Sequence, residues 1–572
     1  MLEGGSATDS LSDTLLALSK YVLIGLSIAL IFRCIRSMLS EHYEPEVWGY
    51  LRHRDQTYTL THWENIIGRA LNADVRVVDA GVKRVHAVLR RSDKGSWRVY
   101  DVFGRGGVWI KNEKAGPGGL LVHDGDSINI GGQRLRFTDL SHEKYEKLEA
   151  KRNAVGRRVS PSVTLLELTV FQIFLLLQHA MSAAEEDLKA IALAWVVLIA
   201  LQWACYFAMR FLGRAGFEIE TLAFYLTTLG LSVAASSAPQ DLLKQVLLIL
   251  ASVLSFLLLG LWLRRLERAM AARTAVAVLS AGLMAVNFVF SDAVLGARNW
   301  LAIAGFSFQP SELVKVGYIY VGASTLDKLF RKGNLLHFIL FSMFCVGTLA
   351  LIGDFGTALI FFMTFLVISF LRSGSIATVF LALASAGMAG FLAVSIKPYI
   401  ARRFAVWGHV WEDVYGAGFQ QTRAMSAAAA GGLYGKGAGF GWLKTIFAAN
   451  TDMVFAFVCE EQGLIIALLM VAAVLTLAFF AVRTARHGRS AYYCIAACAA
   501  MSMLLVQLAL NVFGSLDLLP FTGVTFPFVS RGGTSLLSCW MLMAFIKSAD
   551  YRRDASFAVR PVLREEDGEA EN

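Results

Sequence analysis

A succession of long apolar segments restricts the possible folds of this chain more than any other feature. Each has roughly the 20 residues that an α-helix needs to cross the hydrocarbon core of a bilayer. The chain is 56% apolar, with a mean hydropathy of +0.55, which excludes an ordinary soluble protein. We therefore predict an α-helical polytopic membrane protein with about twelve spans beyond residue 160. The segments lie near residues 162–180, 188–212, 217–236, 241–263, 272–291, 309–326, 335–352, 356–372, 376–396, 454–482, 491–516 and 525–547.

One further apolar segment lies near the start of the chain. Residues 15–32 form a run of roughly 18 largely apolar residues, and no small-residue cleavage site follows it. Its single charge, Lys20, lies near its beginning, where a long side chain can reach the membrane interface. We predict that residues 1–40 form an uncleaved N-terminal membrane anchor.

The distribution of charge predicts the orientation. Lysine and arginine exceed aspartate and glutamate by 53 to 44, and most of these cations flank the apolar runs, so the basic character does not indicate a nucleic-acid partner. Basic loops alternate with loops that hold few cations. This alternation places both ends of the membrane region in the cytoplasm and the loop at 397–453 outside. The basic loops contain Arg157, Arg210, Arg264, Lys328, Arg372, Arg483 and Lys547, and the opposite ones contain Glu185, Asp241, Asp292, Asp354 and Asp517.

Cysteine and histidine do not indicate a metal site. The seven cysteines lie within or beside apolar runs and lack metal-ligand spacing, so we interpret them as packing residues. His179, His409 and His487 form no cluster in the sequence. Whether the protein holds a metal ion is left open at this stage.

A polar segment separates the anchor from the membrane region. Between residues 41 and 158, apolar and polar side chains alternate with period two in several short stretches, with Gly and Asp clusters between them. This pattern predicts a small β-sandwich, and the charge distribution predicts that it is cytoplasmic. The stretches are Asp74–Val78, Trp97–Val102, Val108–Ile110 and Leu135–Phe137.

The loop at 397–453 is long for a connection between membrane spans. Ordered loops of this length are usually functional. Its Gly- and Ala-rich stretch, residues 424–441, allows backbone and short helices to pack closely at the bilayer edge. Asp452 lies where the loop meets the next apolar run. A carboxylate at such a boundary is costly unless it is paired, hydrated or functional.

Residues 217–549 contain an ordered set of motifs. They are Gly296–Lys315, Gly353–Thr357, Gly418–Gln420, Gly431–Gly437, Thr451–Ala456, Glu460–Gly463 and Leu519–Ser535. This set resembles the SEDS family, the RodA and FtsW type of membrane protein. Two residues depart from the family pattern: Arg531 stands where the family commonly has Tyr, and Gly353 where a Pro usually precedes the Asp. Because SEDS proteins usually have ten spans, residues 162–212 are predicted to be an additional pair, and residues 550–572 a charged cytoplasmic tail.

The resemblance implies polymerisation of lipid II on the outer face of the bacterial cytoplasmic membrane, in cell division, elongation or sporulation. The 4-hydroxyl of one GlcNAc attacks the anomeric carbon of another sugar and expels undecaprenyl pyrophosphate. Asp452 matches the family's essential aspartate, so the resemblance implies that it takes the hydroxyl proton. Arg402, Arg403 and Lys436 are candidates for binding the pyrophosphate, and Glu412 for orienting the acceptor or holding a metal.

The same resemblance implies cofactors and partners. A divalent cation, Mg²⁺ or Mn²⁺, is a candidate at the pyrophosphate, and no organic cofactor is expected. The implied partners are lipid II and a class B penicillin-binding protein transpeptidase.

Each candidate residue also has a simpler structural interpretation. Asp452 could cap a helix at the interface, Glu412 could be a solvated loop carboxylate, and Arg402 and Arg403 could contact lipid headgroups. Glu312 and Lys315, one turn apart in an apolar run, are best explained as a buried ion pair. Asp354 is best explained as a cap of the helix that begins near Gly356.

Residues 55–142 contain a second set of motifs. They are Ile67–Arg69, Asn72–Val75, Arg84–Ala87, Gly106–Gly107 and Asp124–Gly131. This segment resembles a forkhead-associated (FHA) domain, a β-sandwich whose loops recognise phosphothreonine. Arg69, Lys83 and Arg84 are the candidate phosphopeptide-binding residues, because cations bind phosphate oxygens. Lys83 stands where the family has Ser, and Gly106 where it has Asn. The resemblance therefore predicts the fold and leaves phosphothreonine binding open.

Two other functions compete with the polymerase. A lipid II flippase would need charged groups through the depth of the bilayer, and Glu312, Lys315 and Asp354 could serve it. A scaffold that recruits phosphorylated partners would need a competent FHA-like domain and would tolerate the loss of Asp452. A carboxylate required at the outer face favours the polymerase.

Overall fold

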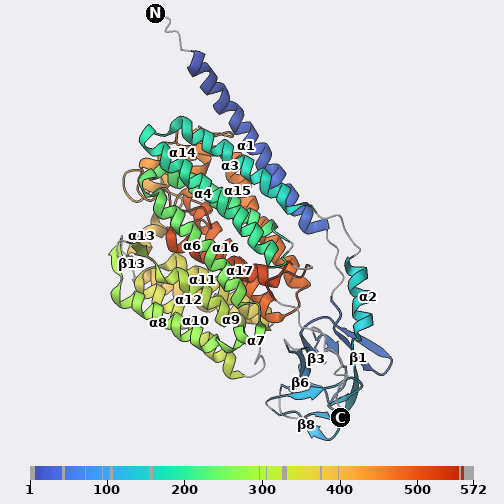
Figure 1. Cartoon of the computed structure of the whole chain (residues 1–572). Coiled ribbons are helices and arrows are strands. Elements are labelled where there is room, and N and C mark those ends of the chain that lie inside the picture. Colours follow the sequence, from blue (N-terminus) through green and yellow to red (C-terminus); the bar gives the residue numbers. More distant parts are fainter. Residues whose placement is uncertain are drawn as a thin grey trace, which may run out of the picture.

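The computed structural model shows a helical bundle and a small β domain beneath it (Figure 1). The long helix α1 (Ala7–Ser40) runs obliquely along the side of the bundle. The structure describes residues 7–40, 46–70, 73–92, 95–102, 107–116, 118–153, 159–214, 216–294, 297–303, 306–324, 332–373, 376–396, 398–552 and 555–558.

All twelve apolar runs beyond residue 160 form helices, as predicted. Among the described residues, eight helices have the length and apolar composition to cross a membrane, and one of them is α1. The count of twelve spans stays a prediction. The bundle helices are α3 (Pro161–Ser182), α4 (Glu185–Phe211), α5 (Glu218–Ser237), α6 (Leu242–Trp262), α8 (Arg273–Phe290), α9 (Pro310–Ser324), α10 (Lys332–Ile352), α11 (Phe355–Ser373), α12 (Ile376–Ile396), α15 (Val454–Arg486), α16 (Ala491–Ser515) and α17 (Gly533–Ala549).

The last run differs from the prediction at its start. The apolar run near 525–547 begins its helix, α17, only at Gly533. Residues 519–532 form instead an irregular segment. Pro520 and Pro527 have no backbone N–H to donate to a helical hydrogen bond, and Gly523 and Phe528 adopt positive φ values of 69° and 65°. Composition alone did not reveal this break.

Shorter elements fill the connections between the bundle helices. In the long loop, helix α14 follows α13, and a small antiparallel sheet precedes α9. The sequence analysis predicted none of these elements, which are too short to show a hydrophobic period. They are α2 (His142–Asn153), α7 (Leu266–Ala271), α13 (Pro398–Val406), α14 (Phe419–Gly431), the 3₁₀ turns η1 (Pro239–Asp241) and η2 (Leu443–Thr445), and strands β12 (Asp292–Val294), β13 (Ala297–Ile303) and β14 (Phe306–Phe308).

Helix α15 is broken at Gly463, and the break joins it to the long loop. Gly463 has φ 89° and ψ 163°, and a Cβ there would lie 2.3 Å from the carbonyl oxygen of Leu433. Around the break the loop and the helix exchange backbone hydrogen bonds. Leu464 N donates to Gly432 O at 3.0 Å, and Lys436 N donates to Glu460 O at 2.9 Å. The loop is therefore fixed to α15 by its backbone.

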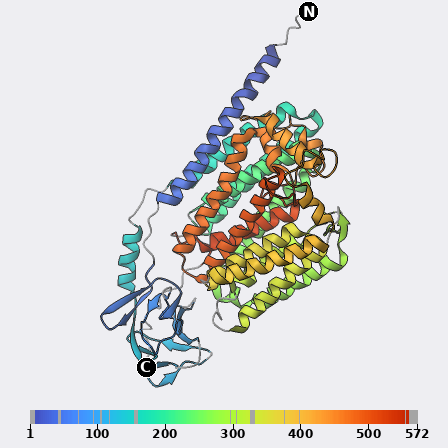
Figure 2. The same ribbon diagram turned by 180° about the vertical axis from the view of Figure 1, so that it is seen from behind.

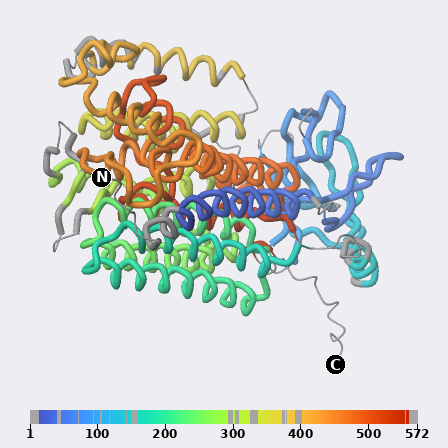
Figure 3. The backbone as a smooth tube through the Cα atoms, turned by 90° about the horizontal axis from the view of Figure 1, so that it is seen from above, coloured from blue at the N-terminus to red at the C-terminus, as the bar shows by residue number. Residues whose placement is uncertain are grey.

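Helix α1, the predicted apolar anchor, also packs against the bundle. It lies between α3 and α15, as the view from above shows (Figure 3). Lys20 Nζ donates to Gly435 O in the long loop at 2.7 Å, and the rings of Tyr21 and Tyr434 lie 5.1 Å apart. The predicted anchor therefore also supports the loop.

The β domain is a sandwich of two sheets, as predicted. Strands of alternating burial pack Trp48, Trp97 and Phe137 into its core. It begins at β1, before the expected boundary at residue 55. One sheet has the order β2-β1-β11-β10-β7-β8, and the other β4-β3-β5-β6-β9. The strands are β1 (Gly49–His53), β2 (Gln56–Leu60), β3 (Glu64–Gly68), β4 (Val75–Arg76), β5 (Ala87–Arg91), β6 (Trp97–Asp101), β7 (Val108–Ile110), β8 (Glu113–Lys114), β9 (Leu120–Val122), β10 (Ser127–Ile130) and β11 (Gln133–Asp139).

The β domain is docked on the turn between α15 and α16, at the lower end of the bundle in the rear view (Figure 2). Glu64 accepts hydrogen bonds from Ser490 Oγ and Ala491 N, both at 3.1 Å, at the start of α16. Trp63 N donates to Arg489 O at 2.7 Å. The Arg489 guanidinium forms a buried ion pair with Glu46 at 2.7 Å.

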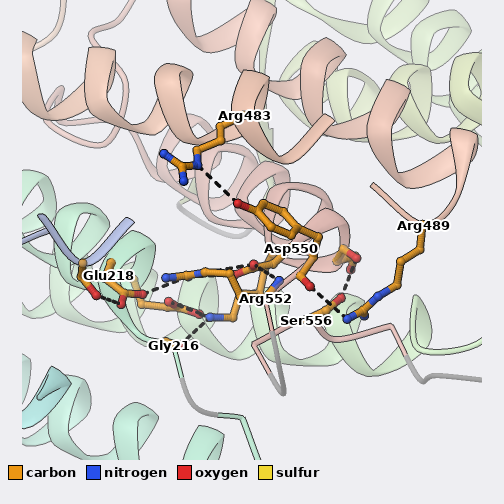
Figure 4. A network of polar contacts seen from close by, with 12 residues as sticks. Gly216, Glu218, Arg483, Arg489, Asp550, Arg552 and Ser556 are labelled. Carbon is orange, nitrogen blue, oxygen red and sulfur yellow. Dashed lines mark hydrogen bonds and ion pairs between the residues drawn. The ribbon is translucent and has the colours of Figure 1, made fainter. Parts of the chain in front are cut away.

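The start of the predicted cytoplasmic tail is buried, which corrects the prediction of a charged tail over 550–572. Arg552 pairs with Glu218 at 3.0 Å and with Asp550 at 2.8 Å (Figure 4). The Phe557 ring packs on Phe256 with ring centroids 5.2 Å apart. Paired charges and an aromatic anchor hold these residues against α5 and α6. The last residues, 559–572, lie outside the described part of the structure.

Candidate active site

A cavity of about 1030 Å³ opens among α9, α11, α13, the residues before α15 and the 519–532 segment. Two of the predicted site residues, Asp452 and Arg403, line it together. Aromatic side chains surround them and provide flat apolar faces of the kind that bind sugar rings and lipid chains. These aromatic residues are Trp300, Phe404, Trp407 and Phe447.

Asp452 is half-buried two residues before α15. Its backbone N donates to Ala448 O at 2.9 Å, and Asn511 Nδ2 donates to Asp452 O at 3.0 Å. Both backbone polar groups of Asp452 are therefore held by hydrogen bonds. Gly523 faces the carboxylate; a Cβ there would lie 3.1 Å from Asp452 Oδ2, so glycine leaves room over the acid. Burial raises the pKa of Asp452 to about 6, against the opposing effects of Thr451 and Arg403. A carboxylate with this pKa is suited to accept a proton near neutral pH.

Arg403 comes from α13 and provides positive charge in the cavity. It donates from Nη1 to Phe521 O at 2.9 Å, which fixes its guanidinium to the 519–532 segment. Arg402 lies in the same helix, but its side chain is outside the described part of the structure. The arrangement brings one of the two predicted arginines to Asp452.

The other two predicted substrate-binding residues lie elsewhere. Lys436 pairs with Glu460 at 2.7 Å, and this carboxylate also accepts from the backbone N of Trp442 and Leu443. Glu412 is exposed in the long loop. Neither belongs to the described cavity lining. In this conformation Lys436 fixes the loop to α15.

The charged residues of α9 form a polar wall of the cavity. Glu312 and Lys315 pair at 2.8 Å, with side chains 5% and 1% exposed, as their spacing predicted. Lys315 also donates to Gln507 Oε1 at 3.2 Å, and Ser538 donates to Glu312 Oε2 at 2.7 Å. These bonds neutralise both charges and join α9, α16 and α17.

Asp354 has the capping role that was predicted for it. Its Oδ1 accepts a hydrogen bond from Thr357 N at 3.0 Å at the start of α11. Burial raises the pKa of Asp354, and its hydrogen bonds with Thr357 oppose this effect. The residue also lines the cavity.

Several cavity residues were missed as functional by the sequence analysis. Asn450, Phe521, Thr522 and Thr525 lie in the cavity lining, and Arg531 was noted only as a departure from the family pattern. Phe521, Thr522, Thr525 and Arg531 belong to the 519–532 segment, whose part from residue 525 was predicted to be helical. Its two prolines were the available signal of an irregular segment.

The described residues do not form a protein-only metal site. No group of three or more His, Cys, Asp or Glu side chains among them could hold an ion. Mg²⁺ is usually held by one or two carboxylates together with substrate phosphates and water. A divalent cation at the pyrophosphate therefore stays a prediction.

The candidate phosphopeptide residues of the β domain lie on adjacent loops. Arg69 N donates to Lys83 O at 2.9 Å, and Ala70 N donates to Arg84 O at 3.0 Å. Gly68 allows this approach, since a Cβ there would lie 2.3 Å from Arg84 O. The side chains of Arg69 and Arg84 are exposed. Gly106 lies outside the described residues.

Comparisons with known proteins agree with this architecture. The sequence model of the FtsW, RodA and SpoVE cell cycle proteins matches residues 222–555, and that of the FHA domain matches residues 65–131. Stage V sporulation protein E of Bacillus subtilis is 33% identical over 259 residues, which are 44% of this chain and 69% of that protein. The probable peptidoglycan glycosyltransferase FtsW of Escherichia coli is 31% identical over 327 residues, 54% of this chain and 76% of that one.

Across the curated relatives quoted and a mycobacterial RodA, the chain spans between 60% and 76% of their length. A solved peptidoglycan synthase complex contains a chain that is 24% identical, with a TM-score of 0.47. The alignment covers 58% of this chain and 96% of that one.

Proposed function

Because the chain belongs to the FtsW, RodA and SpoVE family and carries an FHA domain, we propose that it is a peptidoglycan glycosyltransferase that polymerises lipid II into glycan strands. The observation that supports this most is the position of Asp452. It lies with Arg403 in one cavity of about 1030 Å³, and its pKa is raised to about 6. A base and a cation in one cavity are what transfer of a sugar from a diphosphate to a hydroxyl requires.

The reaction can be written with these residues. The acceptor hydroxyl oxygen forms a bond to the anomeric carbon as the bond from that carbon to the diphosphate oxygen breaks. The hydroxyl proton passes to the Asp452 carboxylate. The negative charge that develops on the departing diphosphate is stabilised by Arg403, whose bond to Phe521 O fixes it in advance.

We place the reaction on the outer face of the bacterial cytoplasmic membrane, with the FHA domain in the cytoplasm. Helix α15 supports this arrangement because Asp452 precedes it and Arg489, which contacts the FHA domain, follows it. The part of α15 after the break at Gly463, residues 464–486, is about 35 Å long at 1.5 Å per residue, enough to cross a bilayer. The alternating basic loops give the same orientation.

The partners follow from the two parts of the chain. Lipid II is the substrate of the membrane part. A class B penicillin-binding protein transpeptidase would crosslink its product, and a phosphothreonine protein would bind the FHA loops at Arg69, Lys83 and Arg84. The role in division, elongation or sporulation depends on these partners.

A lipid II flippase is the alternative, and the position of the charged residues disfavours it. Glu312 and Lys315 neutralise one another, and Asp354 caps α11. All three line the same cavity as Asp452. A translocation path would need polar groups from one face of the membrane to the other.

The test is polymerisation of labelled lipid II by the purified full chain, alone and with its transpeptidase. The proposal expects glycan strands, seen as a ladder of long products on a gel. Lipid II that is moved between leaflets of a vesicle without forming glycan would establish the flippase instead.

A further inference from the structure

Arg531 is a cation of the cavity that the proposed mechanism leaves without a role. It lies at the end of the 519–532 segment and lines the cavity together with Asp452. Its backbone N donates to Asn450 O at 2.8 Å, and the neighbouring Ser530 Oγ donates to Thr451 O at 2.5 Å. These bonds fasten Arg531 to the residues that immediately precede Asp452.

The side chain of Arg531 forms an ion pair that is open to exchange. It contacts Asp241 of the η1 turn, and the two side chains are 29% and 39% exposed. Asp241 also pairs with Lys244 at 3.2 Å. Ion pairs between partly exposed side chains contribute little stability. Asp241 can therefore release Arg531 to a ligand with more negative charge.

The cavity thus holds two accessible guanidinium groups at opposite ends of one segment. Arg403 is bound to Phe521 O near the start of the 519–532 segment, and Arg531 lies at its end. Lys315 is the third cation in the described lining, and it is buried in its pair with Glu312. Arginine binds phosphate oxygens with two parallel hydrogen bonds, which suits it to such ligands.

Glycan polymerisation brings two lipid-linked diphosphates together. One leaves from the donor, and the other stays on the acceptor. Each carries negative charge that a partly apolar cavity must compensate. One arginine cannot compensate both if the two sugars meet at Asp452.

We propose that Arg531 binds the diphosphate of the second lipid-linked substrate, and that Asp241 holds Arg531 in place until this diphosphate displaces it. The inference rests on the proposed function for the identity of the substrate. The site itself recognises a polyprenyl diphosphate, and binding of such a ligand can be measured without turnover.

The test measures the dissociation constant of radiolabelled undecaprenyl diphosphate for the full chain in lipid nanodiscs. Because charged hydrogen bonds to phosphate are lost, Arg531→Gln should weaken binding about tenfold, and Arg531→Lys about threefold. Asp241→Asn removes the competing carboxylate, so it should tighten binding about threefold. The KM for lipid II should follow the same order, with kcat changed by less than about threefold.

Lys244→Gln is the matched control. It removes a cation that contacts the same Asp241 but does not belong to the described cavity lining. The dissociation constant of undecaprenyl diphosphate for the Lys244→Gln variant should stay within about twofold of the wild-type value. The melting temperature of each variant shows whether the fold is retained. A merely structural pair would make Arg531→Gln and Asp241→Asn change binding in the same direction, and this result would overturn the proposal.

The outcomes separate this inference from the function on which it rests. If the wild-type chain makes glycan but Arg531→Gln binds the diphosphate as tightly as wild type, the result contradicts the Arg531 site alone. If the variants show the predicted order of binding but the wild-type chain makes no glycan, the result contradicts the proposed function alone.

Discussion

The proton affinity of Asp452 links the local structure of the site to its chemistry. Its carboxylate is half-buried in the same cavity as Arg403, and burial raises its pKa to about 6. A general base works only when it is deprotonated. The rate constant for polymerisation should therefore be half-maximal near pH 6 and fall about tenfold for each pH unit below it. A profile of single-turnover rate against pH measures this.

The same raised pKa of Asp452 predicts that stability falls as the pH rises, whereas the polymerisation rate increases. The pKa of the folded state is raised above that of the unfolded chain, so the folded state binds more protons between about pH 4 and 6. This contribution stabilises the protein at low pH and is lost as the pH rises through 6.

A polymerisation rate that stays flat from pH 5 to 8 would contradict the assignment of Asp452 as the base.

At the residue scale the sequence indicated Asp452, Arg403 and the Glu312–Lys315 pair. Their motifs or spacing involve residues that are close together in the chain, so the sequence alone could identify them. It did not reveal that Lys436 pairs with Glu460, because the two residues are 24 positions apart in the chain. It gave Arg531 no role, because the contact with Asp241 joins two distant turns. Pairings between distant residues leave no periodic signal.

The broken helix α15 is the element that positions the site. Gly463 has a left-handed φ of 89°, and a Cβ would lie 2.3 Å from Leu433 O. Gly463→Ala should therefore lower stability by roughly 2 kcal/mol or more and reduce polymerisation, because the loop ending at Asp452 is displaced. Thermal unfolding and the glycan assay measure the two effects.

Gly347→Ala, in α10, is the control for this element. Nothing lies within 4 Å of the Cβ position at Gly347. Its melting temperature and activity should match wild type. Equal effects of the two substitutions would show that the break in α15 has no special role.

Elements were predicted well where they are long and apolar. All twelve runs are helices, because a membrane span must satisfy its backbone hydrogen bonds internally. The break at Gly463, the late start of α17 and the sheet before α9 were not predicted. The break at Gly463 depends on backbone contacts with the long loop, which hydropathy does not encode.

At the scale of the whole molecule, the FHA domain is attached to the turn between α15 and α16, and the proposed active site lies at the other end of α15. Glu64 caps the start of α16, and Arg489 joins Glu46 to the backbone of Tyr551. The sequence predicted both parts of the chain and the side of the membrane proposed for the domain. It did not predict that they form an interface, because Trp63 and Arg489 are far apart in the chain.

This interface can be tested through Glu64. Glu64→Ala removes both acceptors at the start of α16, so the Ala491 amide should exchange its hydrogen faster, and stability should fall by about 1 kcal/mol. Glu113→Ala, an exposed glutamate of the same domain, is the control and should change neither. Unchanged exchange at Ala491 in the Glu64 variant would mean that the contact is not maintained in solution.

The central claim is that Asp452 is the base of a polymerase, and the most direct measurement is the glycan yield of purified Asp452→Asn. Asparagine keeps the size but cannot accept the proton, so the rate should fall by about 100-fold or more. Stability should be unchanged or slightly higher, because a half-buried charge is removed. Binding of undecaprenyl diphosphate should persist.

Asp413→Asn, the same substitution at an exposed position of the long loop, is the control and should polymerise at the wild-type rate. The account predicts glycan from wild type and Asp413→Asn, and almost none from Asp452→Asn at the same melting temperature. Glycan made by Asp452→Asn at the wild-type rate would contradict it.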